Sequence, residues 1–392
     1  MGQDTEKVNI EVKYWAALNR IPRLGTVRFR KLEAHFGDLK NAWSAGLSDL
    51  KAAGIDGQAA QEILTARQGV DPDGEMSDLE RAGVKALTWH DSEYPARLKE
   101  IPDPPPVLYV KGTMLPADDR ALAVVGTRSP TSYGREATRD LTADLSKNGI
   151  TIVSGLARGI DGIAHRAALD TGGRTIAVVA NGLDIYYPRE HEQLSRQIQD
   201  QGAVVSEYPL GVRPDPRGFP RRNRLISGMS LGTLVMEAAE GSGARWTVYH
   251  ALEQDREVFC VPGSIFSPAS RFTNRMIQEG AKLVSNHTDI LEELNLTVVT
   301  KQPDLPLFRQ VIDPGSGDPD SDNPESWNAE ETALLNHLDD EPLHIDDLGR
   351  NANLPITSVS TLLTMLELKG MVKQVGCMHY VRTREAAPAY GV

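Results

Sequence analysis

Six short apolar runs between residues 121 and 261 limit the possible folds most strongly. They are ALAVV (121–125), TIVS (151–154), TIAVV (175–179), AVVS (203–206), TLVME (233–237) and VFCV (258–261). Short runs that are almost wholly apolar are typical of strands covered by helices on both faces. Amphipathic stretches such as SYGREATRDLTADLSKNG lie between them. The alternation predicts a doubly wound α/β domain with a mostly parallel sheet.

The turns that follow these strands are rich in glycine and contain arginine. In an open parallel sheet, ligands bind beyond the carboxyl ends of the strands, so residues in these turns are candidates for a site. The candidates after the first two strands are Gly126, Thr127, Arg128, Gly155 and Arg158. Glycine allows close backbone approach, and free amides near helix N-termini bind phosphates. This edge of the sheet is therefore predicted to receive an anion.

The segment 217–224, RGFPRRNR, follows the fourth predicted strand and concentrates positive charge around one aromatic ring. Its candidate residues are Arg217, Phe219, Arg221, Arg222, Asn223 and Arg224. A guanidinium fork matches phosphate oxygens, and a phenyl ring offers a face on which an unpaired base can stack. The alternative is a solvated loop whose arginines pair with acidic residues. The neighbouring glycine turns favour a groove for single-stranded nucleic acid.

Composition limits where such a groove can be and what else the chain does. The formal net charge of −12 argues against coating of nucleic acid by the whole surface, so the site must be local. The second turn reads SGLARG rather than G-x-G-x-x-G, and no P-loop sequence occurs, so ATP hydrolysis is not expected. We predict no cofactor, no bound metal and no catalytic residue.

The two cysteines and the absence of long apolar runs indicate a cytoplasmic location. Cys260 and Cys377 give neither a disulfide framework nor a zinc-ligand spacing, and each is interpreted as a small buried apolar residue. No stretch of about 18 uncharged apolar residues occurs, and residues 1–15 lack a basic region that leads into an apolar one. Membrane insertion and export are not predicted.

The sequence before the strand-rich region predicts a separate helical domain at residues 1–115. Apolar residues such as Trp15, Leu18 and Leu24 recur at helical spacing, and glycines separate short helices. The phrases IPRLG and LKAAGI resemble turns of helix-hairpin-helix or SAM-like modules, and a simple helical bundle explains them equally well. Four prolines between residues 102 and 106 indicate an extended connector, which places a boundary near residue 115.

The central domain is expected at residues 116–299, and two further regions follow it. Residues 300–326 are rich in Pro, Gly, Asp and Ser, which predicts a flexible linker. Residues 327–384 show three helical patterns and two strands around Gly376, the outline of a winged helix. Its third helix offers Ser and Thr where a duplex reader would carry Lys or Arg, so protein contact or a scaffolding role is favoured.

Motifs in the central region resemble those of one family, DNA processing protein A, also called DprA or Smf. They are GTRSPTSYG (126–134), SGLARGID (154–161), NGLDIYYPREH (181–191), SEYPLG (206–211), FPRRNRLISGMS (219–230) and VPG (261–263). The resemblance implies a Rossmann-like core between a SAM-like and a winged-helix domain. It also implies a homodimer that binds single-stranded DNA and loads RecA recombinase onto it during natural transformation and DNA recombination.

The resemblance also implies roles for individual residues. Arg128, Arg217, Phe219, Arg222 and Arg224 would line a basic pocket. Within it, Arg128 and Arg224 would hold phosphates and Phe219 would stack on a base. The amides of Gly126, Thr127, Ser154 and Gly155 would complete an anion nest. The chain departs from the family pattern at residues 272–274 and 243–248, where the partner surface and the pocket rim are expected, and this leaves the dimer geometry open.

Two other function classes fit parts of the sequence. Nucleotide phosphoribohydrolases resemble the chain around Glu237, and their chemistry needs a carboxylate that Glu237 or Glu207 could supply. Asp161 and His165, four residues apart, could form an acid/base or metal pair. We favour carboxylates that anchor loop amides, because SGMSLGT replaces the P-G-G-x-G-T run of those enzymes. A nucleotide sensor with the winged helix as its effector is the third possibility.

Overall fold

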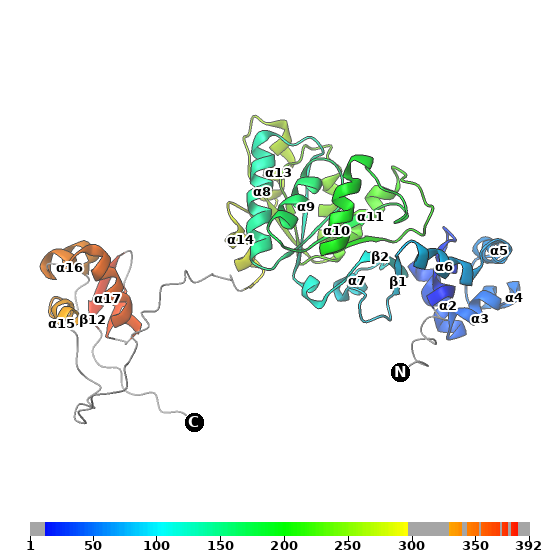
Figure 1. The fold of residues 1–392 in the computed structure, drawn as a ribbon, viewed down its shortest axis with the longest axis horizontal. Coiled ribbons are helices and arrows are strands. Elements are labelled where there is room, and N and C mark those ends of the chain that lie inside the picture. Colours follow the sequence, from blue (N-terminus) through cyan, green and yellow to red (C-terminus); the bar gives the residue numbers. More distant parts are fainter. Residues whose placement is uncertain are drawn as a thin grey trace, which may run out of the picture. The chain divides into compact units, whose positions relative to one another are not determined.

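A computed structural model of the chain describes residues 12–296, 329–338, 343–352, 354–368, 371–374 and 378–382. The chain divides into two compact units, Met1–Asp304 and Leu305–Val392, and Figure 1 shows the elements of each. The predicted linker at residues 300–326 lies outside the described residues.

All six predicted strands are present, and they form the parallel centre of the sheet. They are β3 (Ala121–Val125), β4 (Thr151–Ser154), β5 (Thr175–Val179), β6 (Ala203–Ser206), β7 (Gly232–Val235) and β8 (Glu257–Cys260). Every residue of these strands except Glu257 is buried, because helices cover both faces. Their spatial order, β6-β5-β4-β3-β7-β8, places β3 between β4 and β7.

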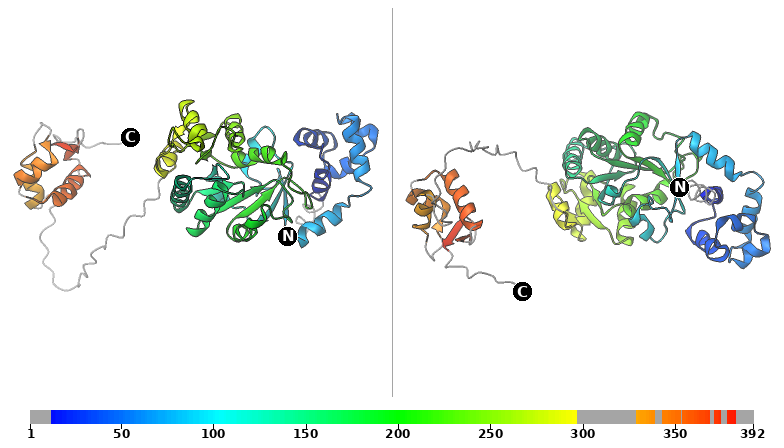
Figure 2. Two further views of the ribbon diagram at one scale, coloured as in Figure 1. Left: turned by 90° about the horizontal axis from the view of Figure 1, so that it is seen from above. Right: turned by 60° about the horizontal axis from the view of Figure 1, so that its bottom comes forward.

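The helices form two layers with the sheet between them (Figure 2). On one face lie α8 (Ser132–Lys147), α9 (Ile160–Asp170) and α10 (Glu192–Gln201), with α14 (His287–Glu293) against α8. On the other face lie α11 (Gly218–Gly228), α12 (Ala244–Glu253) and α13 (Arg271–Gln278). The connection through α11 carries the chain from β6 across to β7, so the winding direction reverses beside β3. This reversal is the position where doubly wound sheets bind ligands.

Further strands extend the sheet at both edges. Among residues 12–296 the sheet has nine strands, with β1 (Lys85–Thr88) and β2 (Val107–Gly112) beyond β6 and β9 (Lys282–Leu283) beyond β8. β2 pairs antiparallel with β6, and β1 pairs antiparallel with β2. The predicted extended connector therefore contains a strand and also α7 (Ala96–Glu100), and the sheet begins before the predicted boundary at residue 115.

The prolines explain why β2 was not predicted. Pro102, Pro104, Pro105 and Pro106 lie in the loop just before β2, where a missing N–H group breaks no ladder. From Val107 to Val110 the strand is fully buried. The short 3-10 helices η1 (Pro116–Asp119), η2 (Arg189–His191) and η3 (Pro268–Ser270) complete the connections of this unit.

The N-terminal segment is built of short helices, as predicted. Residues 12–19 are helical, and α2 (Thr26–Phe36), α3 (Leu39–Ser44), α4 (Leu47–Ala52), α5 (Gly57–Ala66) and α6 (Pro72–Arg81) follow. The side chains of Asp38, Asp56 and Asp71 accept amide hydrogen bonds at the N-termini of α3, α5 and α6. Trp15, Leu18 and Leu32 lie in the core of this segment.

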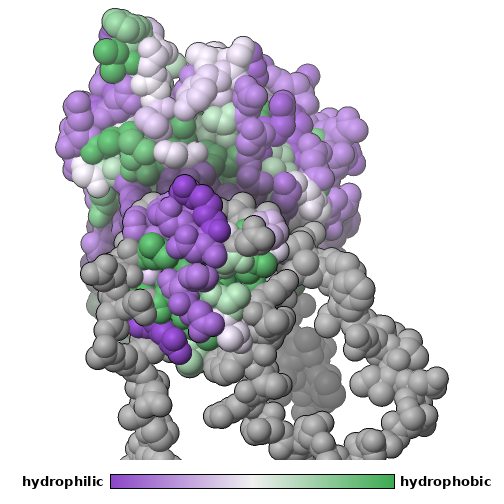
Figure 3. Space-filling model, turned by 90° about the vertical axis from the view of Figure 1, so that its left-hand side faces the viewer, coloured by the Kyte–Doolittle hydropathy of each residue, from purple (hydrophilic) through white to green (hydrophobic). Residues whose placement is uncertain are grey.

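The described part of the C-terminal unit has the predicted winged-helix outline. It contains α15 (Ala329–Leu335), α16 (Ile345–Ala352) and α17 (Ile356–Leu368). The strands β10 (Leu343–His344), β11 (Val372–Gln374) and β12 (His379–Arg382) form a sheet in the order β10-β12-β11. Leu348, Val359 and Leu363 pack in its core, and hydrophilic residues lie beside smaller hydrophobic groups on the surface seen in Figure 3.

Two further predictions concern the burial of the cysteines and membrane insertion. Cys260 is a buried free thiol, as predicted, and burial raises its pKa to about 12. Cys377 lies outside the described residues. In the part of the chain that the structure describes, no helix has the length and apolar character needed to cross a membrane.

Candidate nucleic-acid interface

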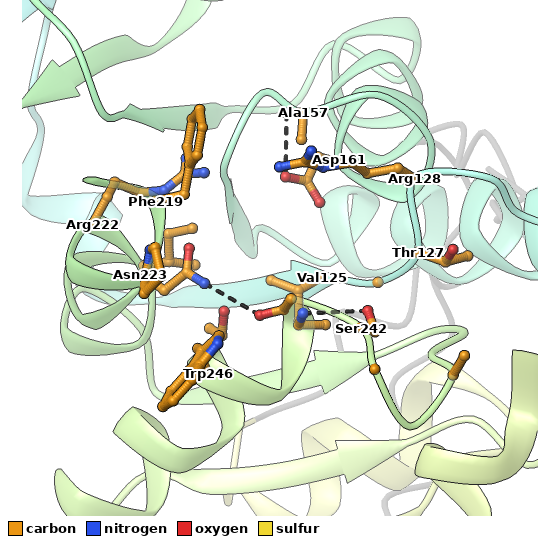
Figure 4. Close-up of a pocket in the computed structure, with 18 residues that line it drawn as sticks. Val125, Thr127, Arg128, Ala157, Asp161, Phe219, Arg222, Asn223, Ser242 and Trp246 are labelled. Atoms are coloured by element: carbon orange, nitrogen blue, oxygen red, sulfur yellow. Dashed lines mark hydrogen bonds between the residues drawn. The ribbon is translucent and has the colours of Figure 1, made fainter. Parts of the chain in front are cut away.

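A pocket of about 520 Å³ opens where β3, β4 and β7 end, beside the reversal of winding (Figure 4). This volume falls within the range of small-ligand sites, about 300–1,000 Å³. Four segments line the pocket: residues 125–128 after β3, residues 157–161 after β4, one face of α11, and residues 239–247 at the start of α12. The predicted strand-end site therefore exists as a cavity.

Arg128 is the exposed cation of this pocket. It follows β3 directly, and its guanidinium carbon lies 5.6 Å from the centre of the Phe219 ring. Among the described residues Arg128 forms no ion pair, and its side chain is exposed. An exposed guanidinium beside an aromatic face keeps its donors available for a phosphate. Arg128 therefore lies in the pocket with its guanidinium free of acidic partners within the described ranges.

Phe219 lies at the centre of a small cluster of rings and cations. Its ring stacks on Tyr187 with a centroid distance of 5.8 Å and an interplanar angle of 27°, and Arg222 lies 5.9 Å away. A second hollow of about 60 Å³ lies on the Tyr187 side and shares Phe219 and Arg128 with the larger pocket. Phe219 is only half-buried. A further flat ring can therefore approach it.

The segment RGFPRRNR is the beginning of a helix, and helical geometry divides its side chains into two sets. Arg217 caps α11, which continues to Gly228. Phe219, Arg222, Asn223 and Ile226, at spacings of three and four residues, all line the pocket. Arg221 and Arg224 point elsewhere and contact Glu207. The predicted basic cluster is therefore split between the pocket and the protein interior.

Arg222 connects α11 to the ends of two strands. Its side chain is buried, and its Nη1 donates to the carbonyl oxygens of Gly155 (2.7 Å) and Val178. Burial lowers the pKa of Arg222 to about 10, and the charge of Arg128 acts in the same direction. The guanidinium stays protonated at neutral pH. It adds positive charge to the pocket floor while holding the helix in place.

The predicted phosphate role of Arg224 does not fit its position. Arg224 is buried, and its Nη2 lies 2.8 Å from Glu207 Oε2 while its Nη1 lies 3.1 Å from Oε1. Its Nε contacts Asp103 at 3.3 Å. A carboxylate that pairs in this bidentate way uses the donors a phosphate would need. Arg224 therefore stabilises the fold beneath α11 and does not reach the pocket.

The three remaining arginines of the predicted set all pair with acidic residues. Arg217 is 91% exposed and pairs with Asp215 at 3.1 Å. Arg221 is 48% exposed and pairs with Glu207 at 3.1 Å. Arg158 lines the smaller hollow and pairs with Glu190. The Arg217–Asp215 and Arg158–Glu190 pairs are exposed and contribute little to stability, so these two arginines can exchange an acidic residue for a phosphate at small cost.

The predicted anion nest is largely used by the protein itself. The Thr127 amide donates to the Glu237 carbonyl oxygen (2.7 Å), and the Gly155 amide donates to Asp161 Oδ2 (3.2 Å). Ser154 is buried, with its hydroxyl donating to the Val124 carbonyl oxygen. A Cβ on Gly126 would lie 2.6 Å from an Ile160 carbon, so this glycine serves close packing. These four residues therefore support the turns around the pocket.

The carboxylates proposed for catalysis anchor the surrounding loops. Glu237 is buried and accepts the Thr131 amide (2.9 Å) and hydroxyl (2.6 Å). Asp161 accepts the amides of Gly155 and Ala157, and burial raises its pKa. These bonds are those expected for carboxylates that anchor loop amides.

His165 does not form a reactive pair with Asp161. The His165 ring is buried, its Nδ1 lies 2.6 Å from the Thr175 hydroxyl oxygen, and burial lowers its pKa to about 3. Across the described ranges, no group of three or more His, Cys, Asp and Glu side chains is arranged to hold a metal. Neither the acid/base nor the metal reading of this pair has support in the geometry.

Two aromatic residues of the site were not predicted. Tyr187 stacks on Phe219, and Trp246 lines the large pocket from α12. Tyr187 lies in a predicted strand-end motif, NGLDIYYPREH, so aromatic residues in such turns are the signal that could have identified it. Trp246 belongs to the stretch 243–248, noted only as a departure from the family pattern.

The contrast between Arg224 and Arg221 gives a stability prediction. Replacing Arg224 with Met leaves the Glu207 carboxylate, 4% exposed, without its bidentate partner. We expect the free energy of unfolding to fall by about 3–5 kcal/mol in urea denaturation. Arg221→Met removes an exposed partner of the same carboxylate and should cost less than about 1 kcal/mol. Equal losses in the two variants would contradict the structural role of Arg224.

Comparison with known proteins identifies the family. The family model described as DNA recombination-mediator protein A matches residues 85–295, and that of the DprA winged helix domain matches residues 318–376. The chain is 35% identical over 395 residues to Protein Smf of Synechocystis, covering 95% of this chain and 99% of that protein.

Two further relatives support the same family. Protein Smf of Escherichia coli is 43% identical over 339 residues, covering 86% of this chain and 87% of that protein. The X-ray structure of DNA processing protein A from Streptococcus pneumoniae superposes with a TM-score of 0.62 at 33% identity, covering 72% of this chain and 97% of that one. The family expected from the motifs is confirmed: the chain belongs to the DNA recombination-mediator protein A family, whose members are also named DprA and Smf.

Proposed function

We propose that this protein binds single-stranded DNA without regard to sequence and performs no bond chemistry on it. The observation that supports the proposal best is the pair formed by exposed Arg128 and half-buried Phe219 in the strand-end pocket. A phosphate and its neighbouring base can bind such a pair at the same time, because a guanidinium holds the one and a phenyl face stacks on the other. A duplex keeps its bases stacked on each other and cannot use the ring in this way.

Binding rather than cleavage is supported by the state of the carboxylates. Glu237 and Glu207 are fully engaged with loop amides or arginines. Asp161, which lines the pocket, accepts two amides and is only 8% exposed. A general base or nucleophile needs a free approach to the reacting atom. None of these three carboxylates is therefore free to act as the base or nucleophile of a phosphoribohydrolase-like reaction.

The lack of sequence preference follows from the chemistry of the pocket. Every base has a π face, so stacking on Phe219 tolerates any of them. Arg128 contacts the phosphate that all nucleotides share. Asn223 could read a base edge, but its amide nitrogen donates to the Gly243 carbonyl oxygen at 3.4 Å. Affinity is therefore expected to depend on salt and strand length more than on sequence.

We further propose that the bound strand is handed to the RecA recombinase by a homodimer of this protein in the cytoplasm, during natural transformation and DNA recombination. The family description, a recombination mediator, supports this role, since a mediator acts by helping a recombinase onto its strand. The acidic chain, with a formal net charge of −12, is suited to release DNA once a competitor covers it. The winged helix is the part we assign to protein contact.

Removal of Arg128 should weaken binding through electrostatics. The logarithm of the affinity for oligo-dT should fall linearly with the logarithm of salt concentration, with a slope of about −0.7 for each phosphate contacted. Arg128→Ala should lower the affinity and make the slope shallower by about 0.7, measured by fluorescence anisotropy across a salt series. Arg139→Ala, an exposed arginine on α8 outside the pocket, is the matched control. Identical slopes for both variants would count against the proposed site.

Removal of the Phe219 ring should weaken binding through stacking. Phe219→Ala is expected to cost about 1–3 kcal/mol of binding free energy for oligo-dT, with the salt slope unchanged. Phe266→Ala removes a ring that is 87% exposed and outside the pocket, and it should bind as the wild type does. Equal affinities for Phe219→Ala and wild type would show that no base stacks on this ring.

The recombinase role can be tested separately from DNA binding. RecA ATPase activity should start sooner on single strands coated with a single-strand-binding protein when this protein is added. Arg128→Ala should remove the stimulation, and Arg139→Ala should retain it. Tight DNA binding without any stimulation would disprove the mediator role and leave the binding proposal intact.

A further inference from the structure

Trp246 is a second aromatic residue that lines the large pocket. Phe219 and Trp246 both line the pocket, and in Figure 4 Asn223 lies between them. Phe219 belongs to the first turn of α11, and Trp246 belongs to the first turn of α12, which packs against α11. Trp246 is 41% exposed, although an indole of this size in a helix next to the core could have been buried.

The surroundings of Trp246 resemble those of Phe219. The Arg245 guanidinium carbon lies 5.1 Å from the Trp246 ring centre, compared with 5.6 Å for Arg128 and Phe219. In the described part of the chain, Arg245 forms no ion pair. An arginine next to an exposed ring is the combination that binds a phosphate and stacks a base. Trp246 therefore lines the pocket with a guanidinium against its ring, while Arg245 itself lies just outside the set of lining residues.

The position of Trp246 is fixed by contacts on both sides. Tyr249, one turn further along α12, meets the indole edge-on at 6.1 Å and 80°. The start of α12 is held by the Ala244 amide, which donates to the Ser242 hydroxyl (3.3 Å), and by the Asn223 bond to Gly243. A ring whose helix is held in this way loses little conformational entropy when a base stacks on it.

We propose that Trp246, with Arg245, is a second stacking platform for single-stranded DNA, on which a different nucleotide of the strand held at Phe219 binds. This inference rests on the proposed binding of single-stranded DNA. The strand enters at the Phe219 wall, crosses the pocket, and leaves over the start of α12. Trp246 then sets the path of the strand and adds affinity that does not depend on the base type.

The alternative is that the exposed face of α12 binds another protein. Tyr249 and Leu252 are also exposed, at 41% and 52%, and would extend an apolar patch along α12. Neither of them lines the pocket, whereas Trp246 does. The guanidinium of Arg245, which forms no ion pair in the described part of the chain, also keeps its donors available for a phosphate.

Two measurements test whether a base stacks on Trp246: the affinity for DNA and the intrinsic fluorescence of the protein. Trp246→Ala in the full chain should raise the Kd for an oligo-dT of about 12 nucleotides by at least about fivefold, the lower end of what one stacked base contributes. Trp246→Phe should keep most of the affinity, because a phenyl ring still stacks. Leu252→Ala, an exposed apolar change on the same helix outside the pocket, should bind as the wild type does.

Fluorescence adds a readout that a purely structural role would not change. Stacking of a base should quench the indole emission of the wild type, and Trp246→Phe should lose this quenching while it still binds DNA. The inference is overturned if the wild type binds DNA and Trp246→Ala binds equally well, or if Leu252→Ala loses as much affinity, because the loss would then not be specific to the ring that lines the pocket. Failure of the wild type itself to bind oligo-dT would instead disprove the proposed function.

Discussion

The buried guanidinium of Arg222 is the interaction on which the arrangement of the site depends. By donating to the carbonyl oxygens of Gly155 and Val178 it attaches α11 to the ends of β4 and β5. With the helix held there, its period of 3.6 residues brings Phe219 and Asn223 to the pocket. Arg128, after β3, then meets the Phe219 ring from the other side.

The arginines of residues 217–224 serve two purposes, which the amino-acid sequence alone cannot separate. On one face of α11 their positive charge contributes to the pocket, and on the opposite face Arg224 neutralises buried Glu207. A buried carboxylate without such a partner would strongly destabilise the fold. The protein thus has a net charge of −12 and still presents a local basic surface, because only some of its arginines are free. This division explains how an acidic chain can bind a polyanion at one place.

The fold could be predicted from the sequence because each central strand is apolar throughout, and only a sheet covered on both faces explains six such runs. The pair β1 and β2 was missed because the prolines before β2 concealed a buried strand. In the site, Arg128 follows β3 directly, as topology predicts, whereas Phe219 reaches the same pocket from the first turn of α11. The role of Arg224 could not be predicted, because its partners Glu207 and Asp103 lie 17 and 121 residues away and no local pattern reveals them. Trp246 stood out only as an unusual residue, and its exposure became visible once α12 was placed.

A crystal structure of the protein with an oligo-dT would test the central claim most directly, namely that the strand-end pocket is the site for single-stranded DNA. The account predicts a phosphate within hydrogen-bond distance of the Arg128 guanidinium and a thymine ring against Phe219. Arg224 should keep its contacts with Glu207 in the complex. A strand bound on another face of the sheet, with the pocket empty, would contradict the account.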